Sequence, residues 1–162
     1  MSVTSAGVSI AEKSFRMTRT FDAEPHLVFE LWTDPRYMSL WWGIKGATNP
    51  LCGLDVRPGG KWRIDMRTPG GETYTSRGEY LEVVKDQLLV FTDVPDETAM
   101  PEAQPTINTV RFEPDRKRTR VTLEARFASN ADRDRRLQLG VQHGINQSLD
   151  RLAELIARLR PA

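Results

Sequence analysis

Short segments of alternating apolar and polar residues run through much of the chain, and this is the pattern of strands with one buried face. In residues 14–21 the apolar positions Phe15, Met17 and Phe21 fall on one face, which predicts a strand. Arg19 lies on the same face. Because a buried guanidinium needs a carboxylate or a polar ligand to offset its loss of water, we expect Arg19 to be paired.

Five more strands are predicted from alternation or from short apolar runs bounded by turn residues. They are expected at residues 61–67, 74–84, 88–94, 107–113 and 119–127. The side chains expected on the inner face are Trp62, Ile64 and Met66 on the first of these strands, and Val121 and Leu123 on the last. The pattern therefore predicts an antiparallel sheet with one apolar face.

The strand at residues 74–84 has an ambiguous inner face. One phase turns Glu79 inward together with Val83, and the other turns Glu82 inward together with Tyr80. Either phase brings a carboxylate to the inner face of the sheet. We therefore expect Glu79 or Glu82 to be the partner of Arg19.

Helices are predicted before and after these strands. Pro25 and Pro35 stand at helix-start positions next to acidic residues, which predicts two consecutive short helices ending near residues 33 and 41. A long amphipathic helix is expected over residues 131–160. Gly144 and Ser148 lie on the apolar stripe of its first half, so these small residues should leave space between helix and sheet.

Composition narrows the classes of function. The chain has 162 residues and a net charge of +1, which argues against a nucleic-acid-binding protein. No apolar run approaches the roughly 18 residues of a membrane span, and the N-terminus resembles neither a secretory signal nor a transit peptide. We expect a cytoplasmic protein with no membrane partner, built as a single domain over residues 12–162 with a flexible N-terminus over residues 1–11.

The sequence offers no set of residues at catalytic spacing. Its two histidines, His26 and His143, are expected to face solvent, which leaves no basis for an imidazole base or a metal site. Cys52 is the only cysteine, so no internal disulfide can form. We therefore expect no metal and no cofactor.

The order of the elements resembles the helix-grip fold of the START-like (Bet v 1-like, SRPBCC) superfamily. This is an α+β fold in which a curved antiparallel sheet of six to seven strands holds a long C-terminal helix. The segments FDAEPHLVFELWTDP, LWWG, DVRPGGKW, RGEYLEVV, LLVFTD, TRVTL and GVQHGINQSLDRLAELI are similar to the family named for the activator of Hsp90 ATPase. The resemblance covers residues 16–159.

The resemblance implies a cavity between sheet and helix that binds a hydrophobic small molecule. Two adjacent tryptophans cannot both point inward from a short helix, so Trp41 or Trp42 is expected at the cavity rim. The predicted lining is Met17, Arg19, Trp41, Trp42, Trp62, Ile64, Met66, Glu79, Val121, Leu123, Gly144 and Ser148.

Three functions follow from this prediction. We favour the binding of a hydrophobic ligand. A cyclase or dehydratase acting on an aromatic or polyketide-like substrate would need a carboxylate with a perturbed pKa in the cavity, for which Glu79 and Glu82 are the candidates. A protein-interaction module, such as a regulator of an Hsp90-type chaperone, is the third hypothesis. The sequence also leaves open a homodimer.

Overall fold

A curved sheet of eight antiparallel strands forms the body of the protein. The computed structural model describes residues 6–98, 100–102 and 104–159. The strands are β1 (Ala6–Ala11), β2 (Ser14–Phe21), β3 (Thr48–Leu54), β4 (Lys61–Arg67), β5 (Thr73–Val84), β6 (Leu88–Asp93), β7 (Thr106–Asp115) and β8 (Arg118–Arg126). They are arranged in the order β1-β2-β8-β7-β6-β5-β4-β3.

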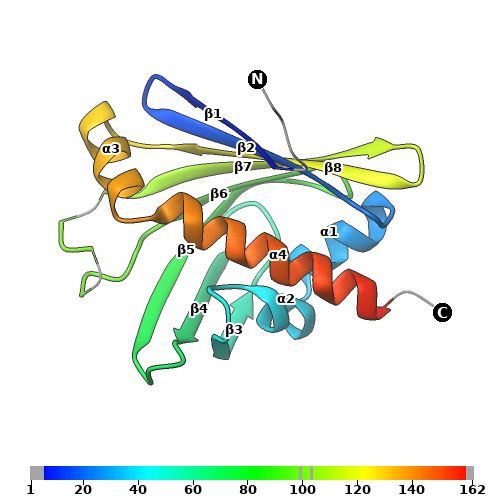
Figure 1. The fold of residues 1–162 in the computed structure, drawn as a ribbon, viewed down its shortest axis with the longest axis horizontal. Coiled ribbons are helices and arrows are strands. Elements are labelled where there is room, and N and C mark those ends of the chain that lie inside the picture. Colours follow the sequence, from blue (N-terminus) through cyan, green and yellow to red (C-terminus); the bar gives the residue numbers. More distant parts are fainter. Residues whose placement is uncertain (1–5, 99, 103, 160–162) are drawn as a thin grey trace.

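Four helices accompany the sheet: α1 (Pro25–Thr33), α2 (Pro35–Trp41), α3 (Asn130–Gln138) and α4 (Val141–Leu159). In Figure 1, α4 runs diagonally across the face of the sheet. The same view places α3 beside the N-terminal end of α4, whereas α1 and α2 lie near its C-terminal half. This is the predicted helix-grip arrangement, with eight strands where six or seven were expected.

The two additional strands account for this difference. β1 pairs with β2 over Ala6–Ala11, so a flexible N-terminus is the wrong description of this segment, whereas residues 1–5 lie outside the described part of the chain. β3 has few buried side chains and contains a proline, so it lacks the alternation by which strands are recognised in a sequence.

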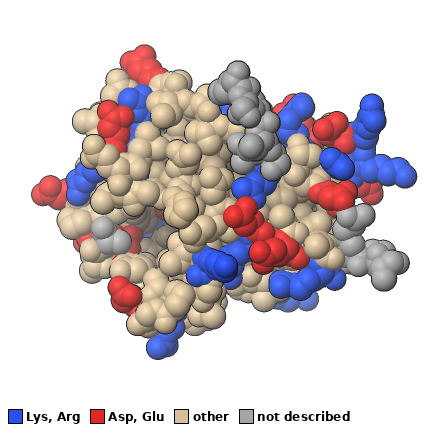
Figure 2. Space-filling view, in the orientation of Figure 1, with Lys and Arg blue, Asp and Glu red and all other residues tan. Residues whose placement is uncertain are grey.

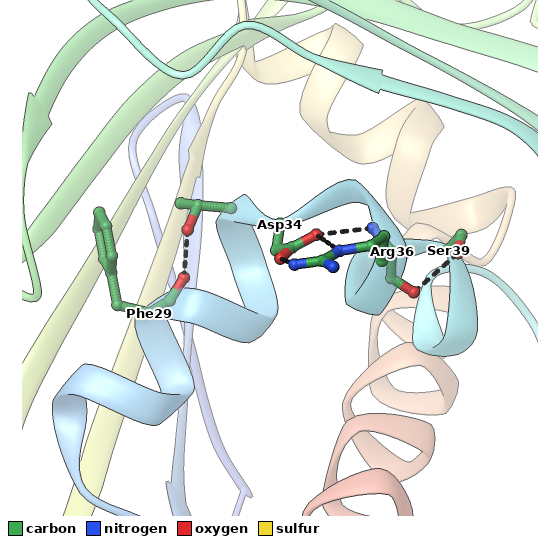
Figure 3. Close-up of polar contacts among 5 residues, drawn as sticks. Phe29, Asp34, Arg36 and Ser39 are labelled. Atoms are coloured by element: carbon green, nitrogen blue, oxygen red, sulfur yellow. Dashed lines mark hydrogen bonds and ion pairs between the residues drawn. The ribbon is translucent and has the colours of Figure 1, made fainter.

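A polar cluster fixes the junction of α1 and α2 (Figure 3). The Asp34 carboxylate accepts a hydrogen bond from the Arg36 backbone N–H at 2.9 Å and forms an ion pair with the Arg36 guanidinium at 2.8 Å. These contacts with Arg36 lower the pKa of Asp34. Thr33 ends α1 with its hydroxyl bonded to the Phe29 carbonyl, and Ser39 bonds the Arg36 carbonyl in α2. Asp34 thus caps the N-terminus of α2 as the Asp-Pro step predicts, whereas the N-cap residue of α1, Glu24, makes no side-chain cap hydrogen bond.

The C-terminal helical region is broken, so the expectation of one helix over residues 131–160 is wrong. Gly140 separates α3 from α4 and has a φ of +87°. Its N–H donates to the Leu137 carbonyl at 3.1 Å, in the left-handed C-terminal geometry that glycine adopts without strain. An isolated glycine is tolerated within a helical pattern, so spacing alone does not locate such a break.

The core confirms the inner face predicted for the first strand. Phe15, Met17 and Phe21 are almost completely buried, together with Val121 on the neighbouring strand β8. Both signs of charge are intermixed on the face crossed by α4 (Figure 2), as the net charge near zero leads one to expect.

Candidate functional site

A cavity of about 260 Å³ lies between the sheet and the N-terminal half of α4. Its wall is formed by residues of β4 to β8 and of all four helices. Five aromatic side chains contribute: Trp32, Trp41, Trp42, Phe91 and Phe127. The polar side chains at the wall are Ser76, Asp93, Thr106, Asn108, Arg136 and Ser148. The cavity is therefore mainly apolar, with a small number of polar groups.

Half of the predicted lining residues reach this cavity: Trp41, Trp42, Met66, Leu123, Gly144 and Ser148. Trp62 and Ile64 instead line a smaller pocket of about 20 Å³. The two pockets share Trp32, Trp42 and Phe91 in their walls. Met17 and Val121 lie in the packed core rather than at the cavity wall, so their assignment to the lining is wrong.

The two adjacent tryptophans differ in burial, as their position in a short helix leads one to expect. Trp41 is completely buried, and its indole N–H donates to the Leu31 carbonyl at 2.9 Å. Trp42 is only partly buried and borders both pockets. Trp42 is thus the one at the rim.

Arg19 faces the helix side of the sheet but finds a different partner from the one expected. Its guanidinium donates to Asp150 of α4 at 2.7 Å and to the Asn146 side chain at 3.3 Å. Glu79 instead pairs with Lys61 at 2.9 Å, and Glu82 is exposed. The assignments of Arg19 and Glu79 to the cavity lining are therefore wrong.

A register shift in β5 explains why neither glutamate enters the cavity. The pairing of β5 with β6 shifts between Tyr80 and Glu82. Tyr80 is buried before the shift, and Val83 packs against the core after it. Strict alternation cannot place both of these residues on one face, so the irregularity removes both glutamates from it.

The carboxylate that does reach the cavity is Asp93, at the end of β6. Its Oδ1 atom is buried and has no hydrogen-bond partner. Burial raises the pKa of this carboxyl to about 6, and the charge of Arg136 offsets part of the effect. The carboxyl of Asp93 therefore keeps its proton to a higher pH than an ordinary aspartate does.

Arg136 of α3 is the second charged residue at the wall of the cavity. It is 4% exposed, and its Nε and Nη1 atoms have no hydrogen-bond partner. Its guanidinium lies over the Phe127 ring, 5.4 Å from the ring centre, which is a cation–π contact. Burial lowers the pKa of Arg136, whereas the negative charges of Asp93 and Asp132 raise it.

The alternation of inward and outward residues along β6 could have identified Asp93 as a cavity residue. Leu89 and Phe91 are buried, so Asp93 continues the inner face of β6. In β7, Thr106 and Asn108 continue the inner face of Val110 and Phe112 in the same way. Arg136 is harder to identify, because α3 is strongly charged and too short to reveal a clear apolar stripe.

Contacts from α4 hold the loop that follows α2 at the edge of the cavity. The Ser148 hydroxyl accepts from the Gly43 N–H at 2.9 Å and lies 3.1 Å from the Gly43 carbonyl oxygen. The Arg151 guanidinium donates to five backbone carbonyls, those of Leu40, Trp42, Gly43, Ile44 and Ala47. The wall between α2 and β3 is thus fixed to the helix.

Open space surrounds the inward side of Gly144. A Cβ atom built at this position meets no heavy atom within 4 Å outside its own helix backbone. This space belongs to the cavity, which Gly144 lines. A small residue on this stripe of the helix therefore leaves space between the helix and the sheet, as the sequence pattern predicts.

Neither histidine contributes to the cavity. His143 is exposed and contacts Gln147, and His26 is exposed and contacts Asp86. Within the described ranges, no group of three or more His, Cys, Asp or Glu side chains is arranged to hold a metal ion. No helix in that part of the chain is long and apolar enough to cross a membrane.

Comparison with known proteins identifies relatives of similar fold. A family model described as activator of Hsp90 ATPase homolog 1-like protein matches residues 22–157. A Rhodobacter sphaeroides protein of known structure is 18% identical, with a TM-score of 0.86 over 96% of this chain and 99% of its own. An Arthrobacter aurescens protein is 26% identical, with a TM-score of 0.86 over 98% of this chain and 94% of its own. No curated protein matches the chain.

Proposed function

The chain belongs to the family of activator of Hsp90 ATPase homolog 1-like proteins, and we propose that it binds a small hydrophobic molecule in the cavity between its sheet and α4. Members of this family typically bind hydrophobic ligands. The observation that carries the proposal is the cavity itself, with five aromatic side chains in its wall. Concave, largely apolar sites with a few polar groups are the usual form of small-molecule sites in proteins.

The volume of the cavity limits the size of the ligand. An engineered apolar cavity of about 150 Å³ in another protein binds benzene, which has six heavy atoms. On this scale, the cavity of about 260 Å³ accommodates a molecule of roughly ten heavy atoms. A bicyclic aromatic molecule such as naphthalene is therefore a suitable probe.

Titration of the protein with naphthalene, followed by calorimetry or by tryptophan fluorescence, tests the proposal. We expect saturable binding, and we expect Gly144→Leu to abolish it because the new side chain occupies the open space beside residue 144. Ala157→Leu is the matched control, since it adds a leucine to the exposed face of the same helix. The proposal fails if neither naphthalene nor a substituted naphthalene of similar size binds, or if both variants bind the probe as the parent protein does.

Asp93 favours a second candidate function, an enzyme that transfers protons. A carboxyl with a pKa of about 6 inside an apolar cavity can exchange a proton with a bound substrate near neutral pH. The bicyclic ketone 2-tetralone carries exchangeable hydrogens beside its carbonyl and is of suitable size. Its hydrogen exchange in D₂O, followed by NMR, should be accelerated by the protein and not by Asp93→Asn. An exchange rate equal to that of buffer alone would exclude this function for such ketones.

A further inference from the structure

Polar groups gather at one end of the otherwise apolar cavity. Asp93 of β6 is the neighbour of Thr106 in β7, and Asn108 follows two positions along the same face of β7. Arg136 reaches the same cavity from α3. We refer to Asp93, Thr106, Asn108 and Arg136 as the polar end of the cavity.

The two charged residues of the polar end do not satisfy each other. The negative charge of Asp93 acts on Arg136, yet neither an ion pair nor a hydrogen bond joins these two described residues. Asp93 Oδ1 and Arg136 Nε and Nη1 are all buried without hydrogen-bond partners. Buried polar atoms are nearly always bonded, so unpaired atoms on two residues that line the same cavity indicate that a polar ligand group binds near these residues.

A single ligand group that pairs with both residues must both donate and accept hydrogen bonds. An ionised carboxylate only accepts, and a guanidinium only donates. A hydroxyl group fits between them, because it has one hydrogen for Asp93 and two lone pairs for Arg136. A charged ligand group would be attracted by one of these two residues and repelled by the other, so it would gain little net attraction to offset its loss of water. The group that fits best therefore carries no net charge.

Other charged residues near Arg136 do not change this assignment. Asp132 and Arg135 of α3 also act on the charge of Arg136, with opposite effects. Neither residue lines the cavity. Asp93 and Arg136 are thus the two charged groups at its wall.

We infer that the polar end of the cavity is a recognition site for a neutral hydroxyl group, and that the ligand is an aromatic alcohol of the phenol class. The aromatic rings of the wall contact the ring system of the ligand, and its hydroxyl lies between Asp93 and Arg136. This inference rests on the proposed function, since it names the class of molecule that enters the same cavity.

A comparison of three probes of similar size tests the inference. Naphthalene is purely apolar, 2-naphthol adds one hydroxyl that stays neutral at pH 7, as the phenol of tyrosine does, and 2-naphthoate adds a negative charge. We expect 2-naphthol to bind at least tenfold more tightly than naphthalene, and 2-naphthoate to bind more weakly than 2-naphthol. Dissociation constants from calorimetric titration at pH 7 give this order.

Substitutions in the polar end test whether its residues cause the preference for 2-naphthol over naphthalene. In the double variant Asp93→Leu/Arg136→Met, both charges are replaced by apolar side chains, so that neither is left buried alone. We expect the preference for 2-naphthol to fall below threefold in this variant while naphthalene still binds. Glu79→Gln is the matched control, because it alters a carboxylate on the outer side of the sheet and should keep the full preference.

The outcomes separate the inference from the proposed function. If 2-naphthol and naphthalene bind equally well and Gly144→Leu abolishes both, the hydroxyl site is overturned and the hydrophobic site stands. A preference for 2-naphthol that persists in the double variant likewise overturns the assignment to Asp93 and Arg136. If none of the three probes binds, the proposed function fails together with the inference.

Discussion

The guanidinium of Arg19 lies 2.7 Å from the carboxylate of Asp150, and this ion pair joins β2 to α4. The two partners differ in exposure: the Arg19 side chain is 11% exposed and the Asp150 side chain 63%. Because Asp150 remains largely in water, removing the arginine does not leave a carboxylate buried alone. The energetic cost should therefore lie far below that of a broken buried pair.

We predict that Arg19→Met lowers the free energy of unfolding by about 1 kcal/mol, between the small value of an exposed pair and the larger value of a buried one. Urea denaturation at neutral pH measures the change. Arg16→Met is the control, since Arg16 lies on the same strand but pairs with Glu124 in a solvent-exposed position. A loss of 3 kcal/mol or more for Arg19→Met would contradict the role that we assign to Asp150.

The sequence predicts the fold because the strands and caps of this chain follow simple periodic rules. Phe15, Met17 and Phe21 alternate without a break, and their strand is confirmed. Asp34 caps α2 as the Asp-Pro step indicates. The break at Gly140 is missed because it depends on one backbone angle, which the spacing of apolar residues does not record.

The site is predicted less well than the fold, because it depends on irregularities and on long-range contacts. Alternation through β5 turns Glu79 or Glu82 inward, whereas the register shift after Tyr80 turns both outward. Arg136 of α3 and Asp93 of β6 line the same cavity although they lie far apart in the sequence, so spacing along the chain does not reveal that they belong to one site. Binding to an Hsp90-type chaperone, homodimer formation and a cytoplasmic location stay predictions.

We predict that Arg151→Met destabilises the protein by about 2–3 kcal/mol, since hydrogen bonds to a charged group contribute more than neutral ones and five carbonyls lose their donor. Hydrogen exchange should show faster exchange at Gly43 and Lys45, whose amides bond to α4. Arg151→Lys keeps the charge but not the planar fork, so it should recover only part of the stability. If the exchange rates of these two amides are unchanged in Arg151→Met, Arg151 does not hold the loop after α2 against α4.

Asp93 gives a prediction for the dependence of stability on pH. Its pKa is about 6 in the folded protein against an ordinary value of 3.8, so between these values the folded state holds a proton that the unfolded chain releases. The contribution of this group to stability is therefore favourable at low pH, falls as pH rises through the window, and is lost above pH 6. One pKa unit corresponds to about 1.4 kcal/mol of unfolding free energy. Because Asp93 lines the cavity, where water can reduce the cost of its charge, we expect this group to change the unfolding free energy by about 1–3 kcal/mol in total.

Asp93→Asn removes this titration while keeping the shape of the side chain. The difference in unfolding free energy between Asp93→Asn and the parent protein should shift in favour of the variant by about 1–3 kcal/mol between pH 4 and pH 8. Urea denaturation at several pH values measures this difference. Glu79→Gln changes a carboxylate on the outer side of the sheet, so its unfolding free energy should depend on pH as that of the parent protein does. If the unfolding free energy of Asp93→Asn also ran parallel to that of the parent protein over this pH range, Asp93 would not be a buried titrating group.

The final prediction concerns the stability of Gly144→Leu. Two outcomes are conceivable for a large residue at this position, overpacking of the core or filling of an open space. The structure favours filling, because a Cβ atom there meets no heavy atom within 4 Å outside its own helix backbone. Replacement of a glycine within a helix also contributes about 0.5–1 kcal/mol in favour of the folded state. We therefore expect an unchanged or higher melting temperature together with loss of ligand binding.

Calorimetry of Gly144→Leu, with His143→Ala as a control, distinguishes these outcomes. His143 is exposed on the same turn of α4, so its removal should leave both melting and binding nearly unchanged. A fall in stability of about 1–3 kcal/mol for Gly144→Leu would indicate overpacking. The space beside Gly144 would then be too small for a leucine side chain, and a ligand of about ten heavy atoms would have to enter the cavity elsewhere.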